Sequence, residues 1–333
     1  MEKIEKLKKI LKKEKLDGYI IPKNDEFFSE YIPDHNDRLN FITDFSGSYG
    51  FALILKNQNY LFVDGRYTLQ ANNQSGKFFK IITIPDKMPS DILKGKKILI
   101  GFDPYLFTKK TLSTFFRNTE CIFKPLDKNL IDEIWERKSQ KNKNKFFIMP
   151  DRSVSEKYQS KINKITKYLK KKKSDYLFIT ASENNAWLLN IRGRDTKYTP
   201  IPFSYILIDK SKNIKLFCDL EKITPNFKKK FEKIEFLDFK VCFKIISDIK
   251  KKKFIIDKNS CSYFYENIID RNNKILNFLD PIYFFKAIKG KQEIESIKKA
   301  HVYDGVALTK YLFWLKKNIY KKNITEISAA QKL

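Results

Sequence analysis

Few residues in this sequence stand at spacings that could support catalysis. The two histidines, His35 and His301, are far apart, and neither has a cysteine or another histidine nearby at metal-ligand spacing. No serine lies in a GxSxG motif, so the sequence offers no starting point for a serine triad. It also contains no GxGxxG or P-loop motif for a nucleotide. We therefore predict no catalytic residue and no metal ligand within the chain.

The first of two clusters that could contact a ligand is a short loop with the hairpin that follows it. The loop FSGSYG spans 45–50, and the hairpin leads to VDGRYTLQA at 63–71. Glycines in the loop permit a close backbone approach. Arg66 and Tyr67 open a predicted helix at a strand end, where α/β sheets often place ligand contacts. The alternative is that Arg66 pairs with an acidic residue of its own domain.

The second cluster is NIRGRDTKYTPIPFSY at 190–205, in which Arg192 and Arg194 flank a glycine. Two prolines then keep the segment extended. This pattern fits an interdomain or substrate-facing loop, and it fits a structural loop equally well.

A repeat along the chain predicts the elements that position these clusters. IEKLKKILKKEKLDGYIIP from residue 4 and INKITKYLKKKKSDYLFIT from residue 162 align without a gap. Each copy is an amphipathic helix followed by a short apolar strand. Further matches follow in the same order: the hairpins 51–64 and 204–219, the strands 96–104 and 252–259, and strands leading to exit helices at 123–138 and 277–291.

The repeat predicts an α/β fold of two tandem domains, each a mixed sheet covered by helices. We place the domains at 1–143 and 144–286, joined by the polar linker SQKNKNK at 139–145. Residues 287–333 belong to neither repeat. They contain a long helical pattern over 293–318 and a short final helix in NITEISAAQKL, with Asn323 and Glu326 at capping-box spacing.

Composition narrows the function classes. The formal net charge of +28 invites a nucleic-acid interpretation, but only eight of the 67 basic residues are Arg, the residue suited to bidentate phosphate and guanine contacts. We expect no nucleic-acid partner. The apolar runs are too short to span a membrane, no signal peptide opens the chain, and the four cysteines are widely spaced. We expect a cytoplasmic protein with free thiols.

Several long motifs resemble one family. SEYIPDHNDRLNFITDFSGSYGFALI at 29–54, with VDGRYTLQA, resembles the first domain of three-domain Xaa-Pro aminopeptidases, the aminopeptidase P enzymes of the creatinase/prolidase "pita-bread" metallopeptidase family. ENNAWLLNIRGRDTKYTPIPFSY at 183–205 resembles their second domain. AIKGKQEIESIKKAHVYDGVAL at 287–308 and WLKKNIYKKNITEISA at 314–329 resemble the opening of their catalytic domain. The sequence departs from the family at Arg194, where Ser is usual, and at Thr199, where Asn is usual.

The resemblance implies two tandem creatinase N-terminal-type domains and, over 287–333, the start of a truncated catalytic domain. In the family, two divalent metals, usually manganese, activate water against the peptide bond that precedes proline. Their ligands lie beyond the matching segments, so no metal or catalytic residue is carried over, and the fragment alone is expected to be inactive. The full-length form is expected to be a homodimer that hydrolyses short proline-containing peptides.

In the family the N-terminal domains border the active-site opening. The residues of this sequence that we assign to the substrate rim are Phe45, Ser46, Gly47, Arg66, Tyr67 and Arg192. The alternative function is a non-enzymatic, protein-binding module of the creatinase fold.

Overall fold

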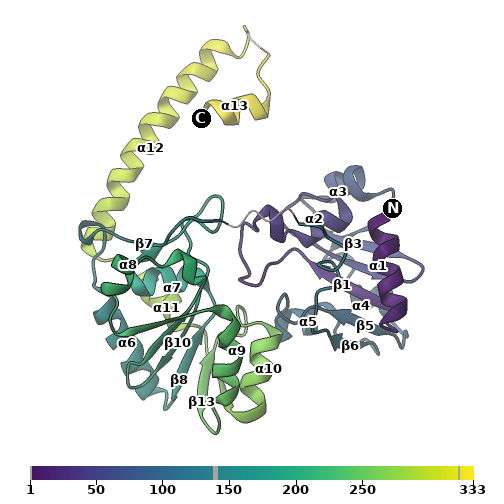
Figure 1. The fold of residues 1–333 in the computed structure, drawn as a ribbon. Coiled ribbons are helices and arrows are strands. Elements are labelled where there is room, and N and C mark those ends of the chain that lie inside the picture. Colours follow the sequence, from purple (N-terminus) through teal and green to yellow (C-terminus); the bar gives the residue numbers. More distant parts are fainter. Residues whose placement is uncertain (1, 138–141, 322) are drawn as a thin grey trace.

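The computed structural model describes residues 2–137, 142–321 and 323–333, and places two domains side by side with a helical arm (Figure 1). The predicted linker at 139–145 lies partly outside the described residues. The elements of the first domain are α1 (Glu2–Lys13), β1 (Gly18–Pro22), η1 (Asp34–Asn36), α2 (Arg38–Thr43), β2 (Phe51–Leu55), β3 (Asn59–Asp64), α3 (Thr68–Ser75), β4 (Lys80–Ile84), α4 (Pro89–Leu93), β5 (Leu99–Phe102), α5 (Lys109–Phe115) and β6 (Ile122–Pro125).

The second domain and the arm complete the chain. In order, their elements are β7 (Phe147–Ile148), η2 (Asp151–Ser153), α6 (Tyr158–Lys171), β8 (Tyr176–Ile179), α7 (Ser182–Leu189), β9 (Ile191–Arg192), β10 (Tyr205–Asp209), β11 (Ile214–Phe217), η3 (Leu220–Lys222), α8 (Pro225–Lys229), β12 (Ile234–Leu237), α9 (Phe239–Asp248), β13 (Lys253–Ile256), α10 (Tyr263–Asn272), β14 (Lys274–Asn277), α11 (Pro281–Ala287), α12 (Lys291–Asn318) and α13 (Glu326–Lys332).

The two main sheets have one topology. The first has six strands in the order β4-β3-β2-β1-β5-β6, and the second has β12-β11-β10-β8-β13-β14. In each sheet, the strand that comes first in the chain, β1 or β8, pairs antiparallel with one strand of a hairpin. On its other side it pairs parallel with β5 or β13. Both edge strands are parallel to their neighbours. The predicted α/β fold of two repeated domains with mixed sheets is confirmed.

The helices cover the two faces of each sheet because successive strand residues point to opposite sides. In the first domain, Tyr19 and Ile21 of β1 pack under α1 in one apolar cluster, whereas Ile20 joins the cluster on the opposite face. The apolar stripe of α1 consists of Ile4, Leu7 and Leu11. The matching stripe of α6 is Ile162, Ile165 and Leu169, which are the positions that the repeat aligns.

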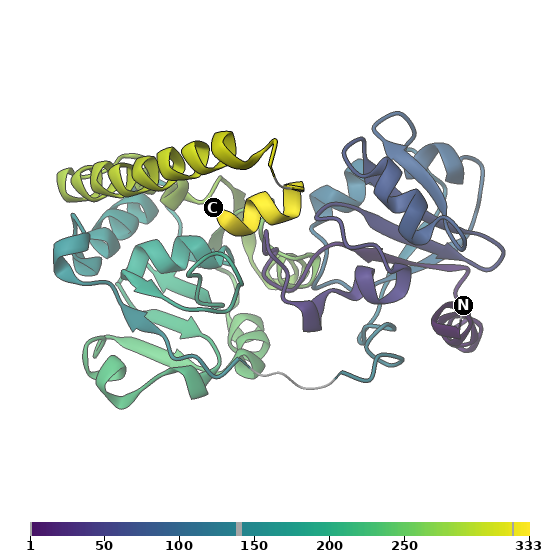
Figure 2. The ribbon, with the colours of Figure 1, turned by 90° about the horizontal axis from the view of Figure 1, so that it is seen from above.

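The arm stands apart from both sheets. α12 rises from the second domain, and α13 turns back beside its far end, so that the Lys332 ammonium lies 5.8 Å from the Trp314 ring (Figures 1 and 2). Neither helix has a buried residue. Apolar side chains such as Val302, Tyr303 and Phe313 are each at least 64% exposed. The arm therefore presents apolar surface that none of the described residues covers.

Some local expectations were wrong. The exit helix predicted within 123–138 does not form over 126–137. Side-chain contacts hold this segment instead: Asp132 pairs with Arg38, and Asn129 accepts from the Ile131 N–H. The cap of α13 is Thr325, which bonds Ser328 reciprocally, and not Asn323. His301 is exposed on α12. All four cysteines are free, three of them buried.

No helix in the part of the chain that the structure describes is long and apolar enough to cross a membrane.

Candidate functional site

Five of the six rim candidates meet in one place on the first domain. The β2–β3 hairpin pairs Phe51 with Phe62, so the loop before β2 lies beside the turn after β3. The buried Phe45 ring stands edge-on to the ring of Tyr67, with 5.7 Å between centroids. The Tyr67 hydroxyl shares a hydrogen bond of 2.7 Å with Ser48. We call Phe45, Ser46, Gly47, Arg66 and Tyr67 the rim cluster.

Polar contacts fix the loop side of the rim cluster. The backbone N–H of Ser46 donates to Gln74 Oε1 over 3.0 Å, and the Ser46 hydroxyl accepts from Gln70 Nε2 over 2.9 Å. Gly47 has no freedom to carry a side chain, since an added Cβ would lie 2.2 Å from the Phe45 ring. The loop is thus a shaped surface held by Gln70 and Gln74 of α3.

Arg66 is exposed and locally paired. Its Nη2 lies 2.7 Å from Asp64 Oδ2, and its guanidinium lies 5.0 Å from the Tyr67 ring centroid. The alternative interpretation, a pair with an acidic residue of its own domain, is therefore present in the structure. The side chain nevertheless keeps 67% of its surface exposed, so its role at the rim stays a prediction.

Arg192 lies elsewhere, on β9 of the second domain. Its Nη1 donates to the carbonyl oxygens of Ile191 and Ala186. Burial lowers the pKa of Arg192, and Glu293 at the start of α12 opposes that shift. Among the described residues, no hydrogen bond or ion pair joins Arg192 to the rim cluster, so the structure does not bring the sixth candidate to the other five.

Aromatic side chains join the two domains. Phe27, in the loop after β1, stacks on Phe203 with 4.2 Å between ring centroids. Tyr105, in the loop after β5, stacks on Phe264 at 4.1 Å. The hydroxyl of Tyr205 donates to the Glu26 carbonyl oxygen over 2.6 Å. Stacked pairs of this kind contribute about 0.5–1.5 kcal/mol each beyond their buried area, so these contacts hold the domains in one arrangement.

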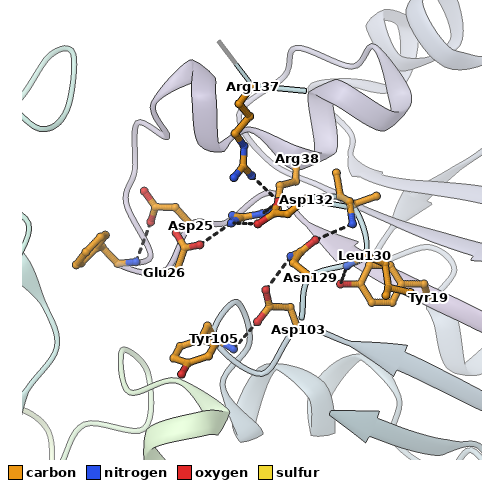
Figure 3. Close-up of polar contacts among 12 residues, drawn as sticks. Tyr19, Asp25, Glu26, Arg38, Asp103, Tyr105, Asn129, Leu130, Asp132 and Arg137 are labelled. Carbon is orange, nitrogen blue, oxygen red and sulfur yellow. Dashed lines mark hydrogen bonds and ion pairs between the residues drawn. The ribbon is translucent and has the colours of Figure 1, made fainter. Parts of the chain in front are cut away.

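A buried charge network supports the loop that carries Phe27 (Figure 3). Arg38, only 4% exposed, donates to both oxygens of Asp132 over 2.8 and 3.0 Å, and to Glu26 Oε1 over 2.6 Å. Arg137 pairs with the same Asp132. Burial works to lower the pKa of Arg38, but Glu26 and Asp132 outweigh it and raise that pKa above its usual value. Arg38 thus stays charged and fastens the loop to the segment after β6.

Two buried aspartates complete this end of the first domain (Figure 3). Asp25 Oδ1 accepts from the backbone N–H groups of Phe27 and Ser29, so it shapes the same loop. Asp103 accepts from the Tyr105 N–H over 2.8 Å and from Asn129 Nδ2 over 2.7 Å. Burial raises the pKa of each aspartate to about 6. These carboxyl groups organise the loops whose aromatic rings face the second domain.

Sequence reasoning missed this network. No role was assigned to Arg38, which lies in the polar YIPDHNDR segment. The only available signal was that Arg38 lies in a motif that resembles the family. Since Arg38 and Asp132 are 94 positions apart, spacing alone could not pair them.

Known proteins share this whole arrangement. Sequence models of the family described as "Creatinase/Prolidase N-terminal domain" match residues 3–133 and 136–293. Xaa-Pro aminopeptidase 1 of Dictyostelium discoideum is 31% identical over 358 aligned positions that cover all of this chain. The chain belongs to the Xaa-Pro aminopeptidase family. A "Probable Xaa-Pro aminopeptidase P" of Paracoccidioides lutzii is likewise 31% identical over 98% of this chain.

A solved member of the Xaa-Pro aminopeptidase family extends the agreement to three dimensions. The crystal structure of X-prolyl aminopeptidase from Caenorhabditis elegans matches 99% of this chain with a TM-score of 0.91 at 26% identity. That protein is described as a cytosolic enzyme with a di-nuclear active site. This chain spans 58% of its length and 56% of the length of the Dictyostelium relative. The chain thus corresponds to somewhat more than half of each.

Over 2–137, 142–321 and 323–333, no three His, Cys, Asp or Glu residues stand together as a group that could hold a metal ion. The described residues therefore do not fit a di-nuclear centre, and we assign them no metal-dependent step.

Proposed function

We propose that this chain is the N-terminal portion of a cytoplasmic Xaa-Pro aminopeptidase, a hydrolase that removes the first residue of peptides with proline in second position. In this proposal residues 1–143 and 144–286 are its two creatinase N-terminal-type domains, and 287–333 open its catalytic domain. Two divalent metals, manganese in our proposal, are bound by residues outside this chain. The 333 residues alone are inactive, and the full-length form is a homodimer.

The observation that carries the proposal is the match to the C. elegans enzyme, which includes the arm as well as both domains: 99% of the chain superposes with a TM-score of 0.91. The exposed apolar side chains of α12 add support, since an uncovered apolar surface of this kind marks a contact with another domain or protein. A further domain packed on α12 and α13 satisfies both observations.

Within the proposed enzyme, the rim cluster borders the opening through which peptides enter. The Arg66 guanidinium supplies a fixed positive charge there, oriented by Asp64 and Tyr67. A carboxylate at the far end of a short peptide would meet this charge, whereas a longer chain would have to pass it. The rim cluster would thereby favour short proline-containing peptides.

The main test compares the 333-residue chain with the longest product of the same gene in its source organism. Both are assayed with manganese on Xaa-Pro-Xaa tripeptides, with Xaa-Ala-Xaa tripeptides as the control. We expect hydrolysis of the proline peptides by the longer product and none by the 333-residue chain. Hydrolysis by the 333-residue chain itself would contradict the proposal. A stop codon directly after Leu333 would favour the non-enzymatic binding module.

Arg66→Ala in the active longer protein tests the rim separately. We expect a higher KM for tripeptides, a smaller change for longer peptides, and an unchanged kcat. Lys77→Ala, a change at another basic residue of the same domain, serves as the control. Equal kinetics of wild type and Arg66→Ala at every peptide length would remove Arg66 from the rim.

A further inference from the structure

Two adjoining cavities lie along α5. The larger, of about 600 Å³, lies between α5 of the first domain and the β13–α10 loop of the second. The smaller, of about 320 Å³, continues past α5 to the end of β1. Lys110 and Asn259 line both cavities, so the two form one groove with walls from both domains. None of the rim candidates lines it.

The groove lies where α/β sheets favour ligands. Asp257, Lys258 and Asn259 directly follow β13, and Asn277 ends β14. On the other side, Pro22 ends β1. Loops at the carboxyl ends of parallel strands are the usual ligand sites of open α/β sheets. Here the repeated domains direct such ends at a shared space.

The groove contains a cation without a carboxylate partner. The Lys110 ammonium donates to Asn259 Oδ1 over 2.7 Å. Within the part of the chain that the structure describes, no carboxylate oxygen lies within 4 Å of it. Lys110 is exposed, and an ammonium can donate three hydrogen bonds. It therefore has donors available for an anionic group in the groove.

The groove also contains a buried anion that lacks a hydrogen bond. The side chain of Glu266 is 4% exposed, and its Oε1 lies 3.7 Å from the ammonium groups of both Lys109 and Lys258. These separations exceed hydrogen-bond distance. Among the described residues, Glu266 Oε2 is buried with no hydrogen-bond partner. A buried carboxylate left in this state costs free energy that a donor group would recover.

An apolar wall occupies the other end of the groove. Tyr49, Phe51 and Phe115 line the smaller cavity, and the rings of Phe51 and Phe115 stack with 4.5 Å between centroids. Tyr49 is 41% exposed, so its ring is available to an apolar group. The groove thus combines an available cation, an unsatisfied anion and an apolar surface.

We propose that this groove binds a small zwitterion with an apolar side chain, an α-amino acid or a short peptide. The ligand carboxylate binds Lys110, the ligand ammonium donates to Glu266, and the apolar side chain packs on Tyr49 and Phe115. Because α5 and the β13–α10 loop belong to different domains, the bound ligand fastens the two domains together. This site is separate from the rim cluster and does not depend on the proposed peptidase function.

The test uses calorimetry on the 333-residue chain with five probes: leucine, leucyl-leucine, N-acetyl-leucine, leucinamide and inorganic phosphate. N-acetyl-leucine has lost the ammonium and leucinamide has lost the carboxylate. We expect leucine or leucyl-leucine to bind at least tenfold more tightly than the three other probes. Tightest binding of leucyl-leucine would assign the site to peptides, and tightest binding of leucine to free amino acids.

Two variants assign the groups. Lys110→Gln should abolish the preference for leucine over leucinamide, and Glu266→Gln should abolish the preference for leucine over N-acetyl-leucine. Lys233→Gln, at an exposed lysine of the second domain, should bind like wild type. Phosphate binding as tight as leucine binding, no binding at millimolar concentration, or unaltered preferences in both variants would each overturn the proposal. If Glu266→Gln does not fold, the exposed Lys110 variant still decides.

Discussion

The two domains are most alike at the start of their central strands. Asp17 precedes β1, accepts from the Leu99 N–H over 2.9 Å, and binds the Lys56 ammonium over 2.5 Å. Asp175 precedes β8 and does the same with the Lys253 N–H over 3.0 Å and the Lys210 ammonium over 2.7 Å. Lys56 directly follows β2, and Lys210 directly follows the equivalent strand β10. The repeat is therefore preserved down to single hydrogen bonds at this end.

At the opposite end, where the domains meet, the likeness stops after one residue. Asp103 follows β5 and Asp257 follows β13, and each accepts from the backbone N–H two residues later. The second oxygen of Asp103 binds the Asn129 side chain, whereas that of Asp257 binds the backbone N–H of Asp280. Beyond these aspartates, the loops of the first domain are held by the Arg38 network, whereas in the second domain Asp257 contacts Asp280 at the start of α11.

The difference indicates which contacts the fold requires and which each domain has acquired separately. Contacts that bind strands to their own sheet occur twice, because each sheet needs them. Contacts that shape the loops at the carboxyl ends occur once, because the two ends face each other and carry different surfaces. We expect substitutions at the interdomain end to be costly in ways that have no counterpart in the other domain.

The largest effect should follow Arg38→Ala. Removing the buried guanidinium leaves Glu26 without the Arg38 cation and leaves Asp132 with Arg137 alone, and breaking a buried ion pair costs about 3–5 kcal/mol. Urea unfolding of the purified chain measures the loss. Arg66→Ala is the matched control, because this exposed pair should contribute no more than about 1 kcal/mol. Equal losses in the two variants would contradict a special role for the interdomain end.

Phe27→Ala should have the next largest effect, about 3 kcal/mol, at the low end for loss of a core phenylalanine because Phe27 is only partly buried. Phe27 contacts Phe203, Tyr205 and Phe239, all of the second domain. We therefore expect calorimetry to show one unfolding transition for wild type and two for Phe27→Ala. Phe123→Ala, at a ring that contacts Phe116 of the first domain, should lower stability without separating the transitions. An unsplit transition in Phe27→Ala would show that other contacts suffice to couple the domains.

The pH dependence of stability should reveal the raised pKa of Asp25. Burial raises the pKa of Asp25 to about 6, against about 3.9 in the unfolded chain. The folded state therefore holds the proton more tightly, and the associated stability is present below about pH 4 and lost as the pH rises through about 6. For one carboxyl group this amounts to about 2–3 kcal/mol.

Asp25→Asn should remove this loss, so its unfolding free energy should fall less than that of wild type between pH 4 and pH 7. Asp127→Asn, at an exposed position, serves as the control. A profile for Asp25→Asn that is parallel to wild type would mean that Asp25 is ionised alike in both states.

The same comparison explains what the sequence could reveal. The strands and the helices α1 and α6 were predictable because their signals are local, apolar residues at helical or alternating spacing. The proximity of the FSGSYG loop and the Arg66–Tyr67 turn was predictable because one hairpin joins them, whereas their role at a substrate opening stays a prediction. The Arg38–Asp132 pair was not predictable, because 94 residues separate the partners and neither residue type demands burial. The separation of Arg192 from the rim cluster was not predictable either, since a linear motif does not say which face its side chain reaches.

The smallest effects should come from Asp17→Asn and Asp175→Asn, and they should be alike. The pKa of Asp17 is lowered first by the Leu99 N–H and then by Lys56, and that of Asp175 first by Lys210. Stability from both groups is therefore present at neutral pH and lost as the pH falls through their folded pKa values.

Because the paired lysines are more than half exposed, each variant should lose only about 1 kcal/mol at pH 7. The two losses should agree within about 0.5 kcal/mol and shrink together in acid, as urea titrations at several pH values can measure. The Asp17→Asn/Asp175→Asn double variant should lose the sum, since the sites lie in separate domains. A clear loss in one variant and none in the other would mean that the shared geometry at this end does not reflect a shared energetic role.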